Sequence, residues 1–300
     1  MRKTSGKSSD RLTPDIPSLK APVGVFDSGV GGLTILRELL RELPGERYTY
    51  FGDTGNCPYG VRPREEIIQL ALNAAEFLIG RGAKLIVVAC NTASSAAIHV
   101  LRKTHPEIKF IAVVPAVKPA AAMTRAGRVA VAATNSSAQS DYLRGLITQF
   151  ANGAEVYPVG CQRLVALAEK GVLDGPEVER QIRADIGPFL ARGIDVLTLG
   201  CTHFPAMRPA FERVCGPDVR VIDSGEAVAR RTRVVLREQG LLAPTDGGPL
   251  AAPRALTAAD EFWRSGPGSA FDRVAAAILD GKPHSRLAKG MLLSAISRAG

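Results

Sequence analysis

The chain has 300 residues, of which 46% are hydrophobic, and its formal net charge is +9. A chain of this length can bury a large core, and two domains are the favoured number. No apolar run approaches the roughly 20 residues that a membrane-spanning helix needs, and residues 1–20 lack the apolar centre of a signal peptide. The sequence therefore predicts a cytoplasmic protein without a membrane partner.

The positive charge is concentrated at the two ends of the chain. Residues 1–20 carry a net charge of +3 and residues 281–300 a net charge of +4, which leaves +2 for everything between them. Basic ends are usually solvated extensions. We therefore expect a disordered basic extension at 1–20 and a basic tail at 281–300, with nucleic acid as a partner only through weak contacts of these tails.

The five cysteines do not form the pattern of a disulfide framework or of a structural zinc site. Their number is odd, and none of them belongs to a Cys-x-x-Cys pair. In a cytoplasmic protein such cysteines are expected to be free thiols. We expect at least two of them to have a chemical role, and we interpret Cys57, Cys161 and Cys215 as structural.

Strands alternate with helices from residue 23 onward. Strands are predicted at 23–27, 48–52, 85–89 and 110–113, with helices near 31–43, 64–80 and 93–104. After Pro115 and Pro119 the pattern restarts with strands at 128–133, 155–159 and 196–199 and helices near 138–150, 162–170, 176–192 and 206–215. This alternation is typical of parallel strands joined by right-handed crossovers.

The last part of the chain adds a few more elements. A strand at 219–222 is followed by Asp223 and Ser224, which are expected to cap a helix that ends near Gly240. A strand near 254–257 and a helix near 269–280 come last.

The two halves of the chain resemble each other. Each begins with an apolar strand that ends in small polar residues, and each later presents a cysteine at the end of a strand. We therefore expect an α/β protein of two similar three-layer α/β/α domains with mainly parallel sheets and an active site in the cleft between them. The first domain is expected to comprise residues 21–114 and 219–280, and the second residues 115–218.

Cys90 and Cys201 stand in matching positions, each after a short apolar strand and before small polar residues. Either could be an inert core thiol. The repeated setting favours a shared role instead, because ligand sites gather at the carboxyl ends of parallel strands. Amides at the amino end of a helix stabilise a thiolate, so we expect both thiols to be more acidic than a free cysteine.

Each thiol has a candidate partner for proton exchange. Asp27 ends the first strand of the unit that contains Cys90, where it is either a helix cap or a cleft carboxylate. His203 follows Cys201 by two residues and is either such a partner or a surface histidine. No second ligand is suitably spaced for a metal, so no metal site is predicted. Neutral donors are expected around the cleft from Ser28, Asn91, Thr92, Ser137 and Thr202.

The glycine-rich turn after the first strand, residues 29–32, does not predict a nucleotide site. Its Gly-x-Gly-Gly spacing differs from the Gly-x-Gly-x-x-Gly of dinucleotide-binding turns. No lysine stands in a setting typical of a pyridoxal enzyme. We therefore expect no cofactor.

Four stretches carry a specific resemblance to the cofactor-independent aspartate/glutamate racemase family. They read GVFDSGVGGL at 24–33, FGDT at 51–54 with PYG at 58–60, ACNTAS at 89–94 and LGCTH at 199–203. The resemblance covers about residues 21–280. Three positions differ from the family pattern: Gly55 and Asn56 replace Ala-Arg, Ser137 replaces a threonine that contacts substrate, and Phe204 replaces a common tyrosine.

The resemblance implies an enzyme that interconverts L- and D-glutamate and supplies D-glutamate for peptidoglycan synthesis. It implies two cysteines on opposite faces of the α-carbon: Cys90 acts on D-glutamate with Asp27 assisting, and Cys201 acts on L-glutamate with His203 assisting. A homodimer is also expected. Substrate contacts are implied for Asp27, Ser28, Tyr59, Gly60, Asn91, Thr92, Ser137, Thr202 and His203, with Asp53 and Glu169 as lesser candidates.

Two alternatives remain open at this point. A racemase with the same fold could act on aspartate, a hydantoin or a malonate, because the cysteine pair does not define the substrate. The other alternative is a basic, nucleic-acid-associated protein. The small charge of +2 outside the tails disfavours it.

Overall fold

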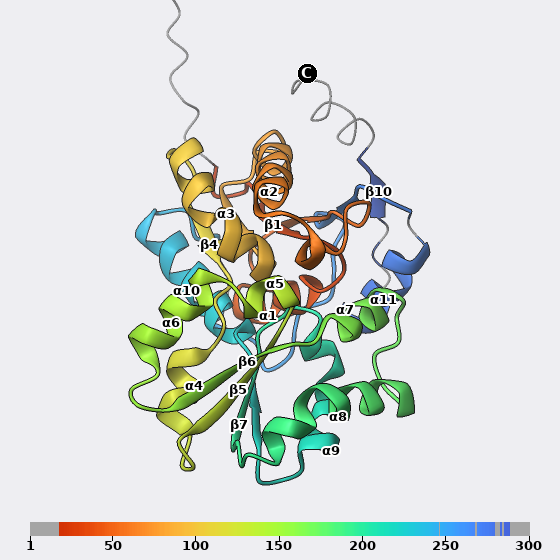
Figure 1. Cartoon of the computed structure of the whole chain (residues 1–300). Helices are drawn as coiled ribbons and strands as arrows, with labels where there is room; N and C mark the ends of the chain where they lie inside the picture. Colours follow the sequence, from red (N-terminus) through yellow and green to blue (C-terminus); the bar gives the residue numbers. More distant parts are fainter. Residues whose placement is uncertain (1–17, 246, 268, 280–282, 284, 289–300) are drawn as a thin grey trace, which may run out of the picture.

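The structure is a computed structural model that describes residues 18–245, 247–267, 269–279, 283 and 285–288. It contains two parallel sheets, which form the cores of two lobes (Figure 1). The first sheet has the strand order β10-β9-β2-β1-β3-β4, with β1 (Val23–Asp27), β2 (Tyr48–Gly52), β3 (Leu85–Val88), β4 (Phe110–Ala112), β9 (Glu261–Arg264) and β10 (Ser285–Leu287). The second has the order β6-β5-β7-β8, with β5 (Arg128–Ala133), β6 (Glu155–Gly160), β7 (Val196–Leu199) and β8 (Arg220–Ile222).

Helices cover both faces of the first sheet, as its fully buried strands β1, β2 and β3 require. One core layer joins the sheet to α1 (Leu33–Glu42), α10 (Gly225–Glu238) and α11 (Ser269–Leu279). The other joins it to α2 (Arg64–Ile79) and α3 (Asn91–Thr104). A short 3₁₀ turn, η1 (Tyr59–Val61), precedes α2.

The second sheet is enclosed in the same way. On one face lie α7 (Gln162–Glu169), α8 (Pro176–Leu190), the 3₁₀ turn η2 (Phe204–Met207) and α9 (Arg208–Cys215). On the other lie α4 (Val117–Met123) and α6 (Asp141–Phe150). The short helix α5 (Asn135–Ala138) contacts η1 and α3 of the first domain, so it lies where the two lobes meet (Figure 1). The predicted α/β class with parallel sheets is confirmed.

Two predictions about strands differ from the structure. The strand β8 pairs with β7, so the expected domain boundary at residue 219 cuts off a strand of the second sheet, whose core takes up Val221. The stretch 254–257 is irregular, because Arg254 extends to Asp260 and to backbone carbonyls. The strand in this part of the chain is instead β9, at Glu261–Arg264, and it pairs with β2.

The expected tails are shorter than predicted where the structure describes them. The strand β10 lies inside the expected tail 281–300 and pairs with β9. The carbonyl of Leu19 accepts a hydrogen bond from Lys84, so the end of the expected extension 1–20 packs on the first domain. Residues 1–17 and 289–300 lie outside the described residues. No helix of the described part is long and apolar enough to cross a membrane.

Candidate active site

Both cysteines of the repeated pattern lie just beyond the carboxyl ends of central strands. Cys90 follows β3, which pairs with β1 and β4, and Cys201 follows β7, which pairs with β5 and β8. The side chains are 4% and 5% exposed, and both cysteines are free thiols. The strand geometry therefore places two buried thiols on corresponding rims of the two sheets.

The two rims contact each other directly. The Thr202 hydroxyl, from the second domain, donates to the Asp27 carboxylate at 3.2 Å, and the Thr34 hydroxyl donates to the Thr202 carbonyl at 2.9 Å. On the other side, the Thr92 hydroxyl lies 3.1 Å from that of Thr134 and 3.2 Å from that of Ser137. The carboxyl ends of the two sheets therefore enclose one junction.

Cys90 occupies the amino cap of α3. Its sulfur accepts a hydrogen bond from the Ala93 amide at 3.4 Å, and its thiol lies 3.7 Å from the Ser28 hydroxyl. Burial, and next the charge of Asp27, raise the pKa of Cys90 to about 12. The expected acidification of this thiol is wrong, because the loss of hydration outweighs the helix amide. The charge of Cys201 adds to the shift, so both sulfurs share one electrostatic environment.

Cys201 is the first member of a chain of three side chains. Its sulfur lies 3.5 Å from Nδ1 of His203, and Nε2 of the same ring lies 2.5 Å from Glu169 Oε1. Burial opposes the charged imidazole, but the hydrogen bonds to Cys201 and Glu169 raise the pKa of His203 well above its ordinary value. Burial likewise opposes the Glu169 carboxylate, yet its contacts with His203 lower its pKa. An imidazolium–carboxylate pair, with the ring buried and the carboxylate partly exposed, therefore stands beside Cys201.

Asp27 is a cleft carboxylate rather than a helix cap, because α1 begins after Gly32 without a side-chain cap hydrogen bond. Its side chain is fully buried and accepts the Gly29 amide at 2.9 Å, while its other oxygen faces Thr202. Burial raises its pKa, and the nearby His203 partly offsets this shift. Among the described residues its carboxylate forms no hydrogen bond with Cys90, on which it acts through its charge.

The neutral donors differ in how far they are already satisfied. Thr92, Thr134 and Ser137 bond to one another. The Tyr59 hydroxyl donates to Asp53 at 2.6 Å and is therefore not a free donor. By contrast, Asn91 Nδ2 is buried and has no hydrogen-bond partner within the described part of the chain. A buried donor without a partner is costly unless a ligand satisfies it.

The structure also brings together groups that the sequence reading separated. Donor atoms of Cys57, Glu169 and His203 lie within 4.8 Å of one another. The sequence predicts a structural role for Cys57 and only a lesser substrate contact for Glu169. The three residues are far apart in the chain, so the sequence did not predict that they meet. The only signal for Cys57 was its position directly before the Pro58–Gly60 motif.

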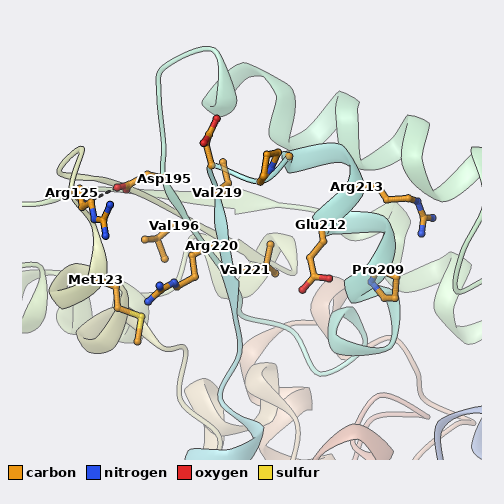
Figure 2. A pocket seen from close by; sticks show the side chains of 13 residues that line it. Met123, Arg125, Asp195, Val196, Pro209, Glu212, Arg213, Val219, Arg220 and Val221 are labelled. Carbon is orange, nitrogen blue, oxygen red and sulfur yellow. Dashed lines mark hydrogen bonds between the residues drawn. The ribbon is translucent and has the colours of Figure 1, made fainter.

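A separate hollow of about 1020 Å³ lies at the end of the second sheet where β7 and β8 begin, opposite to the end that carries Cys201. Figure 2 shows its lining from Arg125, Asp195 and Arg220, which stand at the amino-terminal ends of β7 and β8 or in the loop before β5. Cys201 follows the carboxyl end of β7. The hollow is therefore not part of the cysteine site.

This fold and site define a two-domain α/β protein in which groups able to exchange protons are enclosed at the domain junction. The chain matches the family described as Asp/Glu/Hydantoin racemase over residues 28–232, and it belongs to that family. It is therefore an isomerase of the racemase type.

Relatives and solved structures agree with this assignment. The chain is 45% identical to the glutamate racemase of Roseiflexus sp. over 221 residues, which cover 74% of this chain and 81% of the relative. The structure matches the glutamate racemase of Francisella tularensis in complex with D-glutamate with a TM-score of 0.75, 30% identity, and coverage of 90% and 97% of the two chains. It matches the Escherichia coli enzyme in complex with L-glutamate and an activator with a TM-score of 0.74, 30% identity, and coverage of 88% and 97%.

Proposed function

We propose that this protein is a glutamate racemase that inverts the α-carbon with two cysteine thiols and without a cofactor. The observation that supports the proposal best is the pair of buried thiols on the facing rims, each beside its own ionisable partner. The relatives described above carry the name glutamate racemase, and two of them were solved with an enantiomer of glutamate.

The chemistry explains why thiols are suitable here. The α-proton of an amino acid is weakly acidic, so a base must be held very close to it while oriented donors stabilise the developing charge. Only a few per cent of a free thiol is ionised at pH 7, so its surroundings must supply the rest. Nδ1 of His203 lies 3.5 Å from the Cys201 sulfur and can exchange a proton with it, so we assign Cys201 as the base for L-glutamate.

Cys90 has the complementary property. Its raised pKa keeps it a neutral thiol, so it can return a proton to the opposite face of the α-carbon. After one turnover from L- to D-glutamate, Cys201 holds the abstracted proton and Cys90 is a thiolate, and D-glutamate reacts by the reverse transfer. Asp27 and His203 are the groups that exchange protons with the two sulfurs.

The substrate carboxylates require donors at the junction. Asn91 Nδ2 has no hydrogen-bond partner among the described residues, so it can donate to a carboxylate oxygen of the substrate. We propose further contacts from Ser28, Thr92, Thr202, Ser137 and the backbone around Tyr59 and Gly60. Glutamate is favoured over aspartate by the relatives' names, and comparing the rates on the two amino acids tests this choice.

The test is proton exchange at the α-carbon in deuterated water with purified protein and no added cofactor. We expect Cys90→Ala and Cys201→Ala each to lose racemisation by about 100-fold or more, the usual contribution of one proton-transfer group. Cys90→Ala should still exchange the α-proton of L-glutamate, because it retains the base Cys201. Cys201→Ala should exchange that of D-glutamate more slowly, because the raised pKa of Cys90 keeps its thiol neutral.

The matched control is Cys215→Ala, which removes a free thiol at the end of α9 outside the junction. It should racemise at the unmodified rate. Full racemisation by either of the other two variants would exclude the two-thiol scheme.

The proposal extends to the role of the product and to assembly. We propose that the product D-glutamate serves peptidoglycan synthesis. The test is whether the gene supports growth of a cell that requires added D-glutamate. A homodimer stays a prediction that sedimentation equilibrium checks.

A further inference from the structure

We propose that Cys57, Glu169 and His203 form a Zn²⁺-binding site that joins the two domains and inhibits the enzyme. The three residues come from three separate segments. Cys57 lies in the loop between β2 and η1, Glu169 ends α7, and His203 precedes η2. One thiol, one carboxylate and one imidazole therefore converge from both domains.

The spacing of the donor atoms suits a small cation. Zinc binds sulfur, nitrogen and oxygen at about 2.0–2.3 Å, which places tetrahedral ligand atoms about 3–4 Å apart. The donor atoms here all lie within 4.8 Å of one another. Nε2 of His203 and Oε1 of Glu169 are 2.5 Å apart, so a metal would enter by separating them by about 1 Å.

The ligand set favours zinc over magnesium or calcium. Hard cations prefer oxygen ligands, whereas a thiolate with an imidazole suits zinc. Three protein ligands leave a fourth position for water, as in zinc sites that stay open. On binding, the Cys57 thiol releases its proton to solvent and the sulfur coordinates as a thiolate.

The surroundings hold these ligands in place. The Val30 amide donates to Glu169 Oε1 at 3.1 Å, and the second ring nitrogen of His203 faces Cys201. Such contacts orient metal ligands. A Cβ at Gly29 would collide with Glu169 Oε1 and lie 3.0 Å from the Cys57 sulfur, so glycine lets the backbone approach both ligands.

The site can be reached from solvent. The Glu169 side chain is 22% exposed and Cys57 is only partly buried, whereas His203 is covered. A cation can therefore enter past the carboxylate and the thiol before it contacts the ring.

Bound zinc would affect the reaction in two ways, a consequence that rests on the proposed function. It would fix the loop of the first domain to α7 and η2 of the second, which opposes opening of the junction. It would also occupy Nε2, so that Nδ1 keeps its hydrogen and His203 can no longer exchange a proton with Cys201.

The test of the site itself needs no activity measurement. Titration of the purified protein with Co²⁺, a spectroscopic substitute for zinc, should give one equivalent bound, a thiolate-to-metal charge-transfer band and visible bands of tetrahedral cobalt. Zinc should displace the cobalt. Cys57→Ser should abolish the charge-transfer band and weaken zinc binding by about tenfold or more, whereas Cys215→Ser should change neither.

Cys201→Ser separates the proposal from its nearest competitor, a site made by Cys201 and His203. The charge-transfer band should persist in this variant. Loss of the band in Cys201→Ser, or its full retention in Cys57→Ser, would overturn the assignment of Cys57 as the ligand. Absence of any band in the unmodified protein would overturn the site.

Inhibition is measured last, as the ratio of rates with and without zinc in each variant. We expect zinc to inhibit the unmodified enzyme and Cys215→Ser equally, and Cys57→Ser to need about tenfold more zinc. If cobalt binds as described but glutamate is not racemised, the site stands and the proposed function fails. Inhibition that is equal in Cys57→Ser would contradict the inhibitory role.

Discussion

At the scale of single residues, the two thiols have similar positions but different electrostatic neighbours. Cys90 faces the Asp27 carboxylate, and Cys201 faces the His203–Glu169 pair. A nearby negative charge opposes a thiolate, and a nearby positive charge favours it. This difference supports the proposal that Cys90 is the thiol that returns a proton to the α-carbon.

Asp27 gives a prediction about stability and pH. Burial raises its pKa in the folded protein, so the folded state binds its proton more tightly than the unfolded state does. This contribution stabilises the fold at low pH, below the ordinary pKa of an aspartate, and is lost as the pH rises through the raised value. At pH 7 the ionised carboxylate is therefore a cost to the fold.

We accordingly expect Asp27→Asn to raise Tm at pH 7 by about 2–4 °C, which corresponds to about 1 kcal/mol for a chain of this size. Near pH 3 the variant and the unmodified protein should melt together. Thermal unfolding followed by circular dichroism at both pH values checks this. A lower Tm for the variant at pH 7 would mean that the Gly29 and Thr202 contacts outweigh the loss of hydration.

At the scale of elements, the junction depends on a close approach between η1 and α5. A Cβ at Gly60 would lie 2.7 Å from the Thr134 Cβ and 2.9 Å from Gln162 Oε1. Both neighbours belong to the second domain, so a methyl group here would push the two domains apart.

We predict that Gly60→Ala destabilises the protein by about 1–3 kcal/mol, the usual cost of overpacking, and raises KM for glutamate. The matched control is Gly145→Ala in α6, where the new Cβ meets nothing within 4 Å. That change should stabilise by about 0.5–1 kcal/mol, because alanine favours a helix. Urea unfolding of both variants measures the difference, and equal effects would contradict the close approach.

At the scale of the whole molecule, one buried ion pair joins distant parts of the first domain. The Lys84 ammonium lies 2.6 Å from Glu46 and donates to the carbonyls of Leu19 and Leu241. Both side chains of the pair are at most 1% exposed. The ammonium therefore ties the start of the described chain and the segment after α10 to the sheet.

Lys84→Met should destabilise the protein by about 3–5 kcal/mol, because it leaves the Glu46 carboxylate buried without its cation. The double variant Lys84→Met with Glu46→Gln should recover part of that loss. Lys103→Met, at an exposed position in α3, serves as the control and should change stability by less than about 1 kcal/mol. Chemical denaturation measures the stability of all three variants. If Lys84→Met were as stable as Lys103→Met, the role of the ion pair would be contradicted.

The sequence by itself determined the local elements and the two cysteine positions. Apolar runs such as 23–27 and 196–199 became strands with the expected bounds, because a strand buried on both faces must be apolar along its length. The four motif stretches are local in the same way, since each contains or directly follows the carboxyl end of a strand.

Only the tertiary structure decided which strand pairs with which and what surrounds each ionisable group. The sheet of β8, the register of β9 and the pairing of β10 depend on partners far away in the chain. The high pKa of Cys90 depends on burial and on Asp27, and the cluster of Cys57, Glu169 and His203 depends on how the two domains meet. Hydration and charge act through space, so positions far apart in the sequence set these properties.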